Sequence, residues 1–210
     1  MHTYHHFIWD FDGMLFDTYP HTVAAFCECC RRFGIPADEK EAYALFKVTM
    51  RHAFARYGFT PAHVEAFYQI ENDLDFLPRG VPYPHIPALL RQIAEHGGRN
   101  YLYTHRDKVA LQYLDLYGLT GLFTDFVTGE DGFPLKPAPD ALNALIKRNG
   151  LKKDACLMLG DRDIDIGAGV NAGIGTLLYD DENRYPEGVG ETWRCTDAQT
   201  LEQTIMRFLK

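Results

Sequence analysis

The hydrophobic and polar positions of this chain follow two different periods. Between residues 18 and 77 apolar residues recur at helical spacing, in "TVAAFCECCRRFG", "ADEKEAYALFKVTMRHAFARYG" and "TPAHVEAFYQIENDLDFL". The first segment closes on Gly34, a common helix end, and the third begins with Thr60 before Pro61, which is typical of a helix start. No strand pattern interrupts this stretch, so we expect a self-contained helical insert of roughly 60 residues.

The remainder of the chain alternates short apolar runs with amphipathic segments. Residues 78–87, "PRGVPYPHIP", contain four prolines and one glycine, which is linker composition. We expect a strand at "HFIWD" before the insert, and strands at "NYLYTH", "TDFVTG", "ACLMLGD" and "IGTLLYD" after the linker. Helical segments separate the later strands and follow the last one, from "PALLRQIAEHGG" to "DAQTLEQTIMRFL".

Strands and helices that alternate with short joints predict a parallel sheet with helices on both faces. The expected fold class is therefore α/β, with a Rossmann-like, doubly wound parallel sheet as the core. We expect this core to contain residues 1–17 and 79–210. The small all-α domain is expected at residues 18–78, inserted after the first strand.

Composition and charge narrow the classes of function. The 210 residues are 46% hydrophobic and 24% charged, as in an ordinary soluble globular protein. With 21 Lys and Arg against 29 Asp and Glu, the net charge is −8 without a basic cluster, which argues against a nucleic-acid partner. No apolar segment approaches the ~18 residues of a membrane span, and "MHTYHHFIWDF" has no signal-peptide pattern. We expect a cytoplasmic protein that does not bind membranes.

The cysteines do not indicate a metal or disulfide framework. Their number, five, is odd and fits a reducing compartment. Cys27 and Cys30 have CxxC spacing, but no second pair follows at finger-like spacing and their segment reads as a helix. We expect them to pack within that helix, and expect His2, His5 and His6 to flank the fold and not to bind metal.

Polar side chains follow the predicted strands at the sheet edge where ligands bind, beyond the carboxyl ends of the strands. Two carboxylates end the first strand, a threonine ends the second, a lysine follows the third, and two further aspartates follow the fourth. The side chains expected to converge there are Asp10, Asp12, Thr104, Lys136, Asp161 and Asp165, and His105 and Arg106 directly follow Thr104.

Asp10 and Asp12 lie one residue apart, and their charges would repel each other unless a cation is present. Hard oxygen ligands around a vacancy suit Mg²⁺, which takes a few carboxylates together with substrate phosphate. We therefore expect Mg²⁺ as the cofactor, with the cation and Lys136 together offsetting the charge of Asp10 and Asp12.

The chain resembles the haloacid dehalogenase superfamily, in the subgroup of phosphoglycolate phosphatases and β-phosphoglucomutase. The matching motifs are "DFDGMLFDT", Thr104, "KPAPD" with Lys136, and "GDRDIDIGAGVNAG", in that order between Asp10 and Gly173. The resemblance implies that the helical insert is a cap domain that closes over the site and excludes water. Met14 replaces a usual Thr or Val at a packing position, and His105 stands where Asn is frequent.

The resemblance also implies roles for individual residues. Asp10 would be the nucleophile and Asp12 the general acid and base. Thr104 and Lys136 would hold the phosphoryl oxygens. Mg²⁺ would be bound by Asp10, the backbone carbonyl of Asp12, and Asp161, with support from Asp165.

Other residues are expected around the substrate. His105 occupies a position beside the substrate in relatives, and His21 is a candidate to line the site. Lys47 and Arg51 either read an anionic group of the substrate or lie on the wet face of a cap helix. Arg106 and Arg162 either add positive potential at this edge of the sheet or are solvated residues at helix starts, and we expect the second.

The expected function is a Mg²⁺-dependent phosphatase that hydrolyses a small phosphate monoester, of phosphoglycolate or sugar-phosphate type, through an aspartyl-phosphate. The expected partner is this small-molecule ester, and the chain is expected to be a monomer or homodimer. Dehalogenases and phosphonatases of the superfamily lack the second aspartate of the first motif, so Asp12 argues against them. A phosphosugar mutase keeps all four motifs and stays an alternative, as does a non-catalytic binding protein on the same fold.

Overall fold

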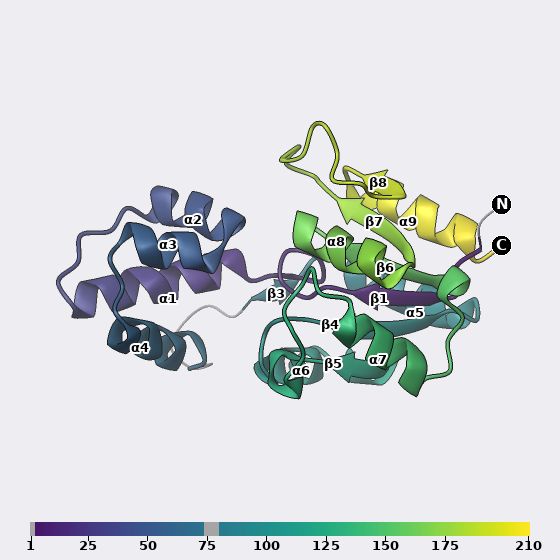
Figure 1. Ribbon diagram of the computed structural model, residues 1–210, viewed down its shortest axis with the longest axis horizontal. Helices are drawn as coiled ribbons and strands as arrows, with labels where there is room; N and C mark the ends of the chain where they lie inside the picture. The colour runs from purple at the N-terminus through teal and green to yellow at the C-terminus, as the bar shows by residue number, and fades with distance from the viewer. Residues whose placement is uncertain (1–2, 74–79) are drawn as a thin grey trace. The chain divides into compact units, whose positions relative to one another are not determined.

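The computed structural model describes residues 3–73 and 80–210, which fall into two compact units (Figure 1). The core unit contains the chain up to Leu15 and from Pro82 onward, and the helical unit contains Phe16–Val81. The predicted boundary between residues 78 and 79 lies outside the described residues, as does His2.

The core unit is built on a six-stranded sheet in the order β5-β4-β1-β6-β7-β8 (Figure 1). Every neighbouring pair is parallel, and Ile8 of the central strand is in register with Tyr101 on one side and Met158 on the other. The strands are β1 (His6–Trp9), β4 (Arg99–Tyr103), β5 (Phe123–Val127), β6 (Cys156–Gly160), β7 (Gly175–Tyr179) and β8 (Trp193–Cys195). The predicted α/β class with a parallel sheet is confirmed, and β8 is an additional strand.

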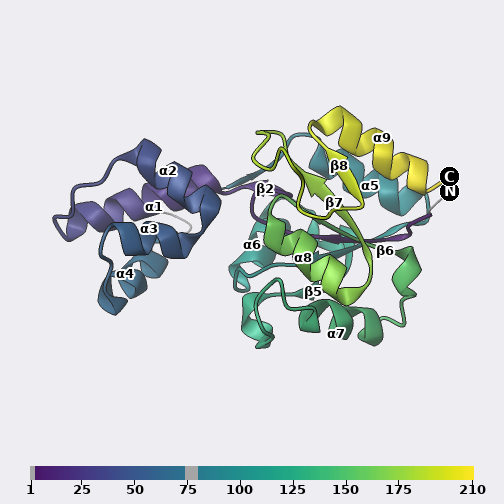
Figure 2. The same ribbon diagram turned by 45° about the horizontal axis from the view of Figure 1, so that its top comes forward.

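Helices cover both faces of this sheet, as the doubly wound prediction requires (Figure 2). Helices α7 and α8 pack on one face, and α5 and α9 on the other. Their bounds are α5 (Ile86–Glu95), α7 (Asp140–Arg148), α8 (Asp163–Ala172) and α9 (Ala198–Phe208), while α6 (Val109–Leu116) connects β4 toward β5. The strand order reverses at β1, and in sheets of this kind ligands bind at the carboxyl ends of the strands beside the reversal, here β1, β4 and β6.

Burial of apolar side chains holds the sheet and helices together. Ile8, Tyr101 and Met158 pack beneath Leu142 and Leu145 of α7. On the central strand the indole of Trp9 is fully buried, and its Nε1 donates to Asn100 Oδ1 over 3.0 Å. Asn100 Nδ2 in turn donates to the carbonyl oxygen of Leu90, so the buried amide is hydrogen-bonded on both sides.

The helical unit consists of α1 (Tyr19–Arg32), α2 (Glu39–Val48), α3 (Met50–Arg56) and α4 (Pro61–Glu71). Two short strands, β2 (Phe16–Asp17) and β3 (Val81–Pro82), pair with each other. The predicted second helical segment is divided at Thr49, whose extended backbone ends α2 and whose side chain accepts from His52 N–H at the start of α3.

Aromatic rings fill the centre of the helical unit. Phe26 is fully buried, and its ring stacks on Phe59 at 4.8 Å and meets Phe46 edge to face at 5.2 Å. Cys29 and Cys30 are buried in the same cluster, and all five cysteines are free thiols. None of the described helices is long and apolar enough to cross a membrane.

Candidate active site

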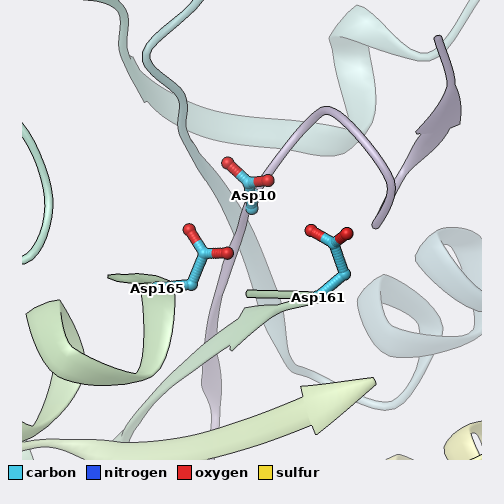
Figure 3. Close-up of side chains that lie close together, drawn as sticks. All are labelled: Asp10, Asp161 and Asp165. Atoms are coloured by element: carbon cyan, nitrogen blue, oxygen red, sulfur yellow. The ribbon is translucent and has the colours of Figure 1, made fainter. Parts of the chain in front are cut away.

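Three buried carboxylates meet at the carboxyl ends of the central strands (Figure 3). Asp10 follows β1, Asp161 follows β6, and Asp165 lies in the first turn of α8. One carboxylate oxygen from each lies within 4.8 Å of the others, and this is the one group of three or more possible metal-ligating side chains found among residues 3–73 and 80–210. We refer to Asp10, Asp161 and Asp165 as the acidic triad.

Glycine allows the triad to close. A Cβ added to Gly160, the last residue of β6, would lie 2.2 Å from the Cβ of Asp165. Any larger residue would therefore displace that carboxylate. Asp165 Oδ2 also accepts from the N–H of Arg162 over 3.1 Å, which fixes the carboxylate at the start of α8.

Lys136 provides a buried cation beside the triad. Its Nζ donates to Asp10 Oδ1 over 2.5 Å, to Asp165 Oδ1 over 2.8 Å, and to the carbonyl oxygen of Tyr103 over 3.0 Å. The side chain is completely buried. Burial alone would lower the pKa of this ammonium, but Asp10 and Asp165 raise it above its ordinary value, so Lys136 stays charged.

The carboxyl groups of the triad differ in their pKa. Burial, reinforced by the charge of Asp165, raises the pKa of Asp10 to about 7. Burial also raises the pKa of Asp161. For Asp165 burial is outweighed by Lys136 and Arg162, which lower its pKa. Three carboxyls so close together resist full ionisation until a further cation is bound.

The donor set fits a divalent cation that prefers oxygen. Asp10 Oδ2 is buried and accepts no hydrogen bond from any residue that the structure describes. Such an atom is costly unless a ligand satisfies it. Carboxylate oxygens from Asp10, Asp161 and Asp165 match the ligands that Mg²⁺ takes in proteins.

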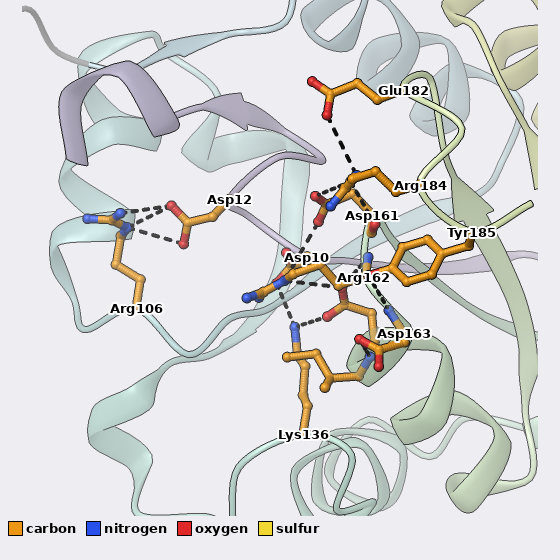
Figure 4. A network of polar contacts seen from close by, with 12 residues as sticks. Asp10, Asp12, Arg106, Lys136, Asp161, Arg162, Asp163, Glu182, Arg184 and Tyr185 are labelled. Carbon is orange, nitrogen blue, oxygen red and sulfur yellow. Dashed lines mark hydrogen bonds and ion pairs between the residues drawn. The ribbon is translucent and has the colours of Figure 1, made fainter. Parts of the chain in front are cut away.

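Asp12 does not join the triad, and its side chain is directed toward Arg106 (Figure 4). Arg106 donates through Nη2 to Asp12 Oδ1 over 2.8 Å and through Nε to the same oxygen over 3.0 Å. The expectation that Lys136 offsets both carboxylates is therefore wrong for Asp12, since Lys136 contacts Asp10 and Asp165 instead.

The two arginines expected at solvated helix starts are not solvated. The Arg106 side chain is 8% exposed because it pairs with Asp12. Arg162 is 18% exposed, and its Nε lies 3.9 Å from Asp161 Oδ1 and 4.0 Å from Asp165 Oδ2. Both therefore add positive charge to the site.

Thr104 and His105 follow β4 at the same edge. Thr104 is buried, and its Oγ1 accepts from the N–H of Arg106 over 3.0 Å. His105 Nε2 accepts from the backbone N–H of Lys136 over 2.7 Å. Burial and the nearby Lys136 lower the pKa of His105 to about 4, so its ring is neutral at physiological pH. His105 thus anchors the segment that carries the buried lysine.

Sequence reasoning missed Arg184. Its Nη2 donates over 2.9 Å both to the carbonyl oxygen and to Oδ2 of Asp161. Arg184 belongs to the loop that follows β7, and that loop begins with Asp180, a carboxylate directly after a strand. Ligands bind beyond the carboxyl ends of parallel strands, and the same rule applied to "IGTLLYD" would have indicated this loop.

The three residues predicted from the cap lie in the helical unit. His21 is buried, and its Nε2 is 2.8 Å from the carbonyl oxygen of Glu71. Lys47 Nζ lies 4.4 Å from the centre of the Tyr19 ring, and Arg51 is exposed. Their roles toward a substrate stay predictions.

Comparisons with known proteins agree with this geometry. Residues 7–179 match the family described as haloacid dehalogenase-like hydrolase. The chain is 27% identical over 184 residues to a phosphoglycolate phosphatase of Aquifex aeolicus, covering 81% of this chain and 82% of the relative. It is 27% identical over 177 residues to the pyrophosphatase PpaX of Halalkalibacterium halodurans, covering 81% of each. A solved hydrolase from Streptococcus pneumoniae is 32% identical with a TM-score of 0.65, covering 85% of this chain and 94% of that one. Since the family match spans most of the chain and includes every residue of the acidic triad, the chain belongs to the haloacid dehalogenase-like hydrolases.

Proposed function

We propose that this protein is a Mg²⁺-dependent phosphatase that hydrolyses a small phosphate monoester through an aspartyl-phosphate on Asp10. The observation that carries the proposal is the state of the Asp10 carboxylate. One oxygen is held by Lys136, Oδ2 accepts no hydrogen bond from the described part of the chain, and the carboxylate belongs to the acidic triad. A buried carboxylate oriented in this way and left with one oxygen available is suited to attack phosphorus.

In the proposed first step, a carboxylate oxygen of Asp10 forms a bond to phosphorus while the bond from phosphorus to the ester oxygen breaks. The leaving oxygen takes a proton from Asp12. In the second step a water molecule gives a proton to Asp12 and attacks phosphorus, and the bond to Asp10 breaks to release inorganic phosphate. Lys136 keeps Asp10 oriented and balances the charge that spreads over the phosphoryl oxygens.

Asp12 needs to change partners in this scheme. In the structure its carboxylate accepts hydrogen bonds from two nitrogens of Arg106. It must leave that contact and take up a proton from solvent before it can protonate the leaving oxygen. Thr104, buried at the end of β4, is proposed to contact the phosphoryl group, as its position in the family motif implies.

Asp10, Asp161 and Asp165 are proposed to hold Mg²⁺, with the backbone carbonyl of Asp12 as a further ligand. The bound cation would offset the negative charge that otherwise repels a phosphate dianion from a carboxylate nucleophile. Phosphoglycolate or a sugar phosphate is the proposed substrate type, by analogy with relatives named phosphoglycolate phosphatase.

The test is phosphate release from a panel that includes 2-phosphoglycolate, sugar phosphates and pyrophosphate, with Mg²⁺ and with EDTA. Asp10→Asn removes the nucleophile, and Asp115→Asn changes an exposed aspartate of α6 as the matched control. We expect Mg²⁺-dependent release by wild type and the control and none by Asp10→Asn. Release that survives in Asp10→Asn would exclude the aspartyl-phosphate. Transfer of phosphate to a sugar in place of water would indicate the mutase.

A further inference from the structure

The loop that follows β7 folds back on a buried carboxylate. Asp180 Oδ1 accepts from the N–H of Arg184 over 2.7 Å, and Asp180 Oδ2 accepts from the N–H of Tyr185 over 3.0 Å. Asn183, between them, has a positive φ of 51°, which allows the chain to reverse. Because Asp180 is 1% exposed, the loop is fixed from inside the core unit.

This loop, residues 180–185, is hydrogen-bonded at two points to the segment that carries Asp161 (Figure 4). The guanidinium of Arg184 donates to both the carbonyl oxygen and Oδ2 of Asp161. One residue later, the hydroxyl of Tyr185 accepts from the N–H of Asp163 over 3.4 Å. These contacts join the loop after β7 to the segment after β6, and they restrict both the backbone and the side chain of Asp161.

Arg184 is placed to orient Asp161 within the triad. A guanidinium nitrogen that contacts the carbonyl and the carboxylate of the same residue limits rotation of that carboxylate. Residues that hydrogen-bond a metal-ligating carboxylate typically change metal affinity by 10- to 100-fold when they are replaced. The positive charge of Arg184 by itself would lower metal affinity, because it weakens the attraction between Asp161 and a cation.

We propose that Arg184 is a positioning residue for the divalent cation: it holds Asp161 in the orientation in which the acidic triad binds the metal, and Asp180 supports it. The orienting effect outweighs the charge effect, because the side chain of Asp161 is nearly fully buried and Arg184 donates directly to its Oδ2. This inference rests on the metal site of the proposed function.

The experiment measures Mn²⁺ binding by the loss of the free-ion EPR signal, with no substrate present. Arg184→Met removes both the charge and the donors, and Arg184→Lys keeps the charge on a single donor nitrogen. We expect Arg184→Met to weaken Mn²⁺ binding by about 10-fold or more, and Arg184→Lys to recover most of it. Arg148→Met is the matched control and should bind Mn²⁺ as wild type does. It removes an arginine at the end of α7 that pairs with Asp125.

A double-mutant cycle tests whether Arg184 acts through Asp161. In an Asp161→Asn background, Arg184→Met should cause no further loss, whereas independent effects would add. Asp180→Asn leaves Arg184 in place but weakens its support, and it should lower the affinity by less than Arg184→Met does. Thermal unfolding of each variant shows that the chains compared are folded.

Unchanged or tighter Mn²⁺ binding by Arg184→Met, with wild type binding normally, would overturn the inference and leave the proposed function standing. Additive losses in the cycle would also overturn it. A wild-type chain that binds no Mn²⁺ would overturn the metal site and this inference together, so the two failures are distinguishable.

Discussion

Replacing Lys136 with methionine tests the described site most directly. The ammonium lies 2.5 Å from Asp10 Oδ1 and 2.8 Å from Asp165 Oδ1, and its side chain is completely buried. Methionine is of similar length and removes the charge and the donors. The acidic triad then remains buried without the cation that held two of its three carboxylates.

The expected loss follows from the cost of breaking a buried ion pair, about 3–5 kcal/mol when one partner is removed. Two carboxylates lose their partner here, but only one of them stays charged. The pKa of Asp10 is already about 7 because of burial and Asp165, and removal of Lys136 raises it further. Because Asp10 takes up a proton at neutral pH, we expect Lys136→Met to destabilise the core unit by about 3 kcal/mol, the lower end of that range.

A divalent cation can replace part of the missing positive charge. A ligand present at about 100 times its Kd stabilises the folded state by about 2.7 kcal/mol. In the variant the triad no longer shares its charge with an ammonium, so it attracts a cation more strongly. We therefore expect Mg²⁺ to stabilise Lys136→Met more than wild type. The difference between their free energies of unfolding should then be smaller with Mg²⁺ than with EDTA.

Both tryptophans of the chain, Trp9 and Trp193, lie in the core unit, so their fluorescence during urea denaturation follows the unfolding of that unit. The free energy of unfolding is measured with MgCl₂ and with EDTA. Lys147→Met, at an exposed position of α7, should change it by less than about 0.5 kcal/mol. If Lys136→Met is as stable as Lys147→Met, the ion pairs of Lys136 with Asp10 and Asp165 are refuted. If Mg²⁺ stabilises the two variants equally, the idea that Lys136 offsets part of the charge of the triad is refuted.

Three other substitutions test packing and charge elsewhere. Gly160→Ala places a Cβ 2.2 Å from that of Asp165 and should weaken Mn²⁺ binding in the EPR titration by about 10-fold or more, whereas normal binding would contradict the close approach. Phe26→Ala empties the centre of the aromatic cluster and should cost about 3–5 kcal/mol in thermal unfolding of the helical unit followed by circular dichroism; a loss below about 1 kcal/mol would contradict that packing. His105 has a folded-state pKa of about 4 against an ordinary 6.5, so its contribution is present above pH 6.5 and is lost as the pH falls toward 4. Between about pH 7.5 and about pH 5.5 this amounts to about 1 kcal/mol, and His105→Asn should remove that part of the pH dependence in urea denaturation; an unchanged slope would show that His105 is not the group responsible.

The longer elements of the core unit were predictable because each leaves a local pattern. The apolar run "ACLMLGD" corresponds to β6, and "DAQTLEQTIMRFL" contains α9 with Asp197 as its cap. β8, by contrast, is the three residues Trp193–Cys195, too few for a period to be recognised. It forms because Leu177, Leu178 and Tyr179 of β7 offer a parallel edge to pair with, and pairing of this kind is a tertiary effect.

The carboxylates and the lysine of the site were predictable because parallel strands end at one edge of the sheet. Their partners were not. Arg106 is 94 residues from Asp12, and Arg184 is 23 residues from Asp161, so neither contact leaves a local pattern. An arginine near a helix start is usually solvated, and only the tertiary partner reveals that it is buried.

The two neighbouring aspartates of the first motif are kept apart by separate cations. Lys136 holds Asp10, and Arg106 holds Asp12, so the charge of Asp12 is already met outside the triad. Among the described residues, the three carboxylates of the triad have three cationic partners, Lys136, Arg162 and Arg184, so these charges balance when all are ionised. A divalent cation changes the sum to +2. A phosphate dianion therefore gains little attraction before the cation binds and is attracted afterwards, so the geometry favours binding of the cation before the substrate.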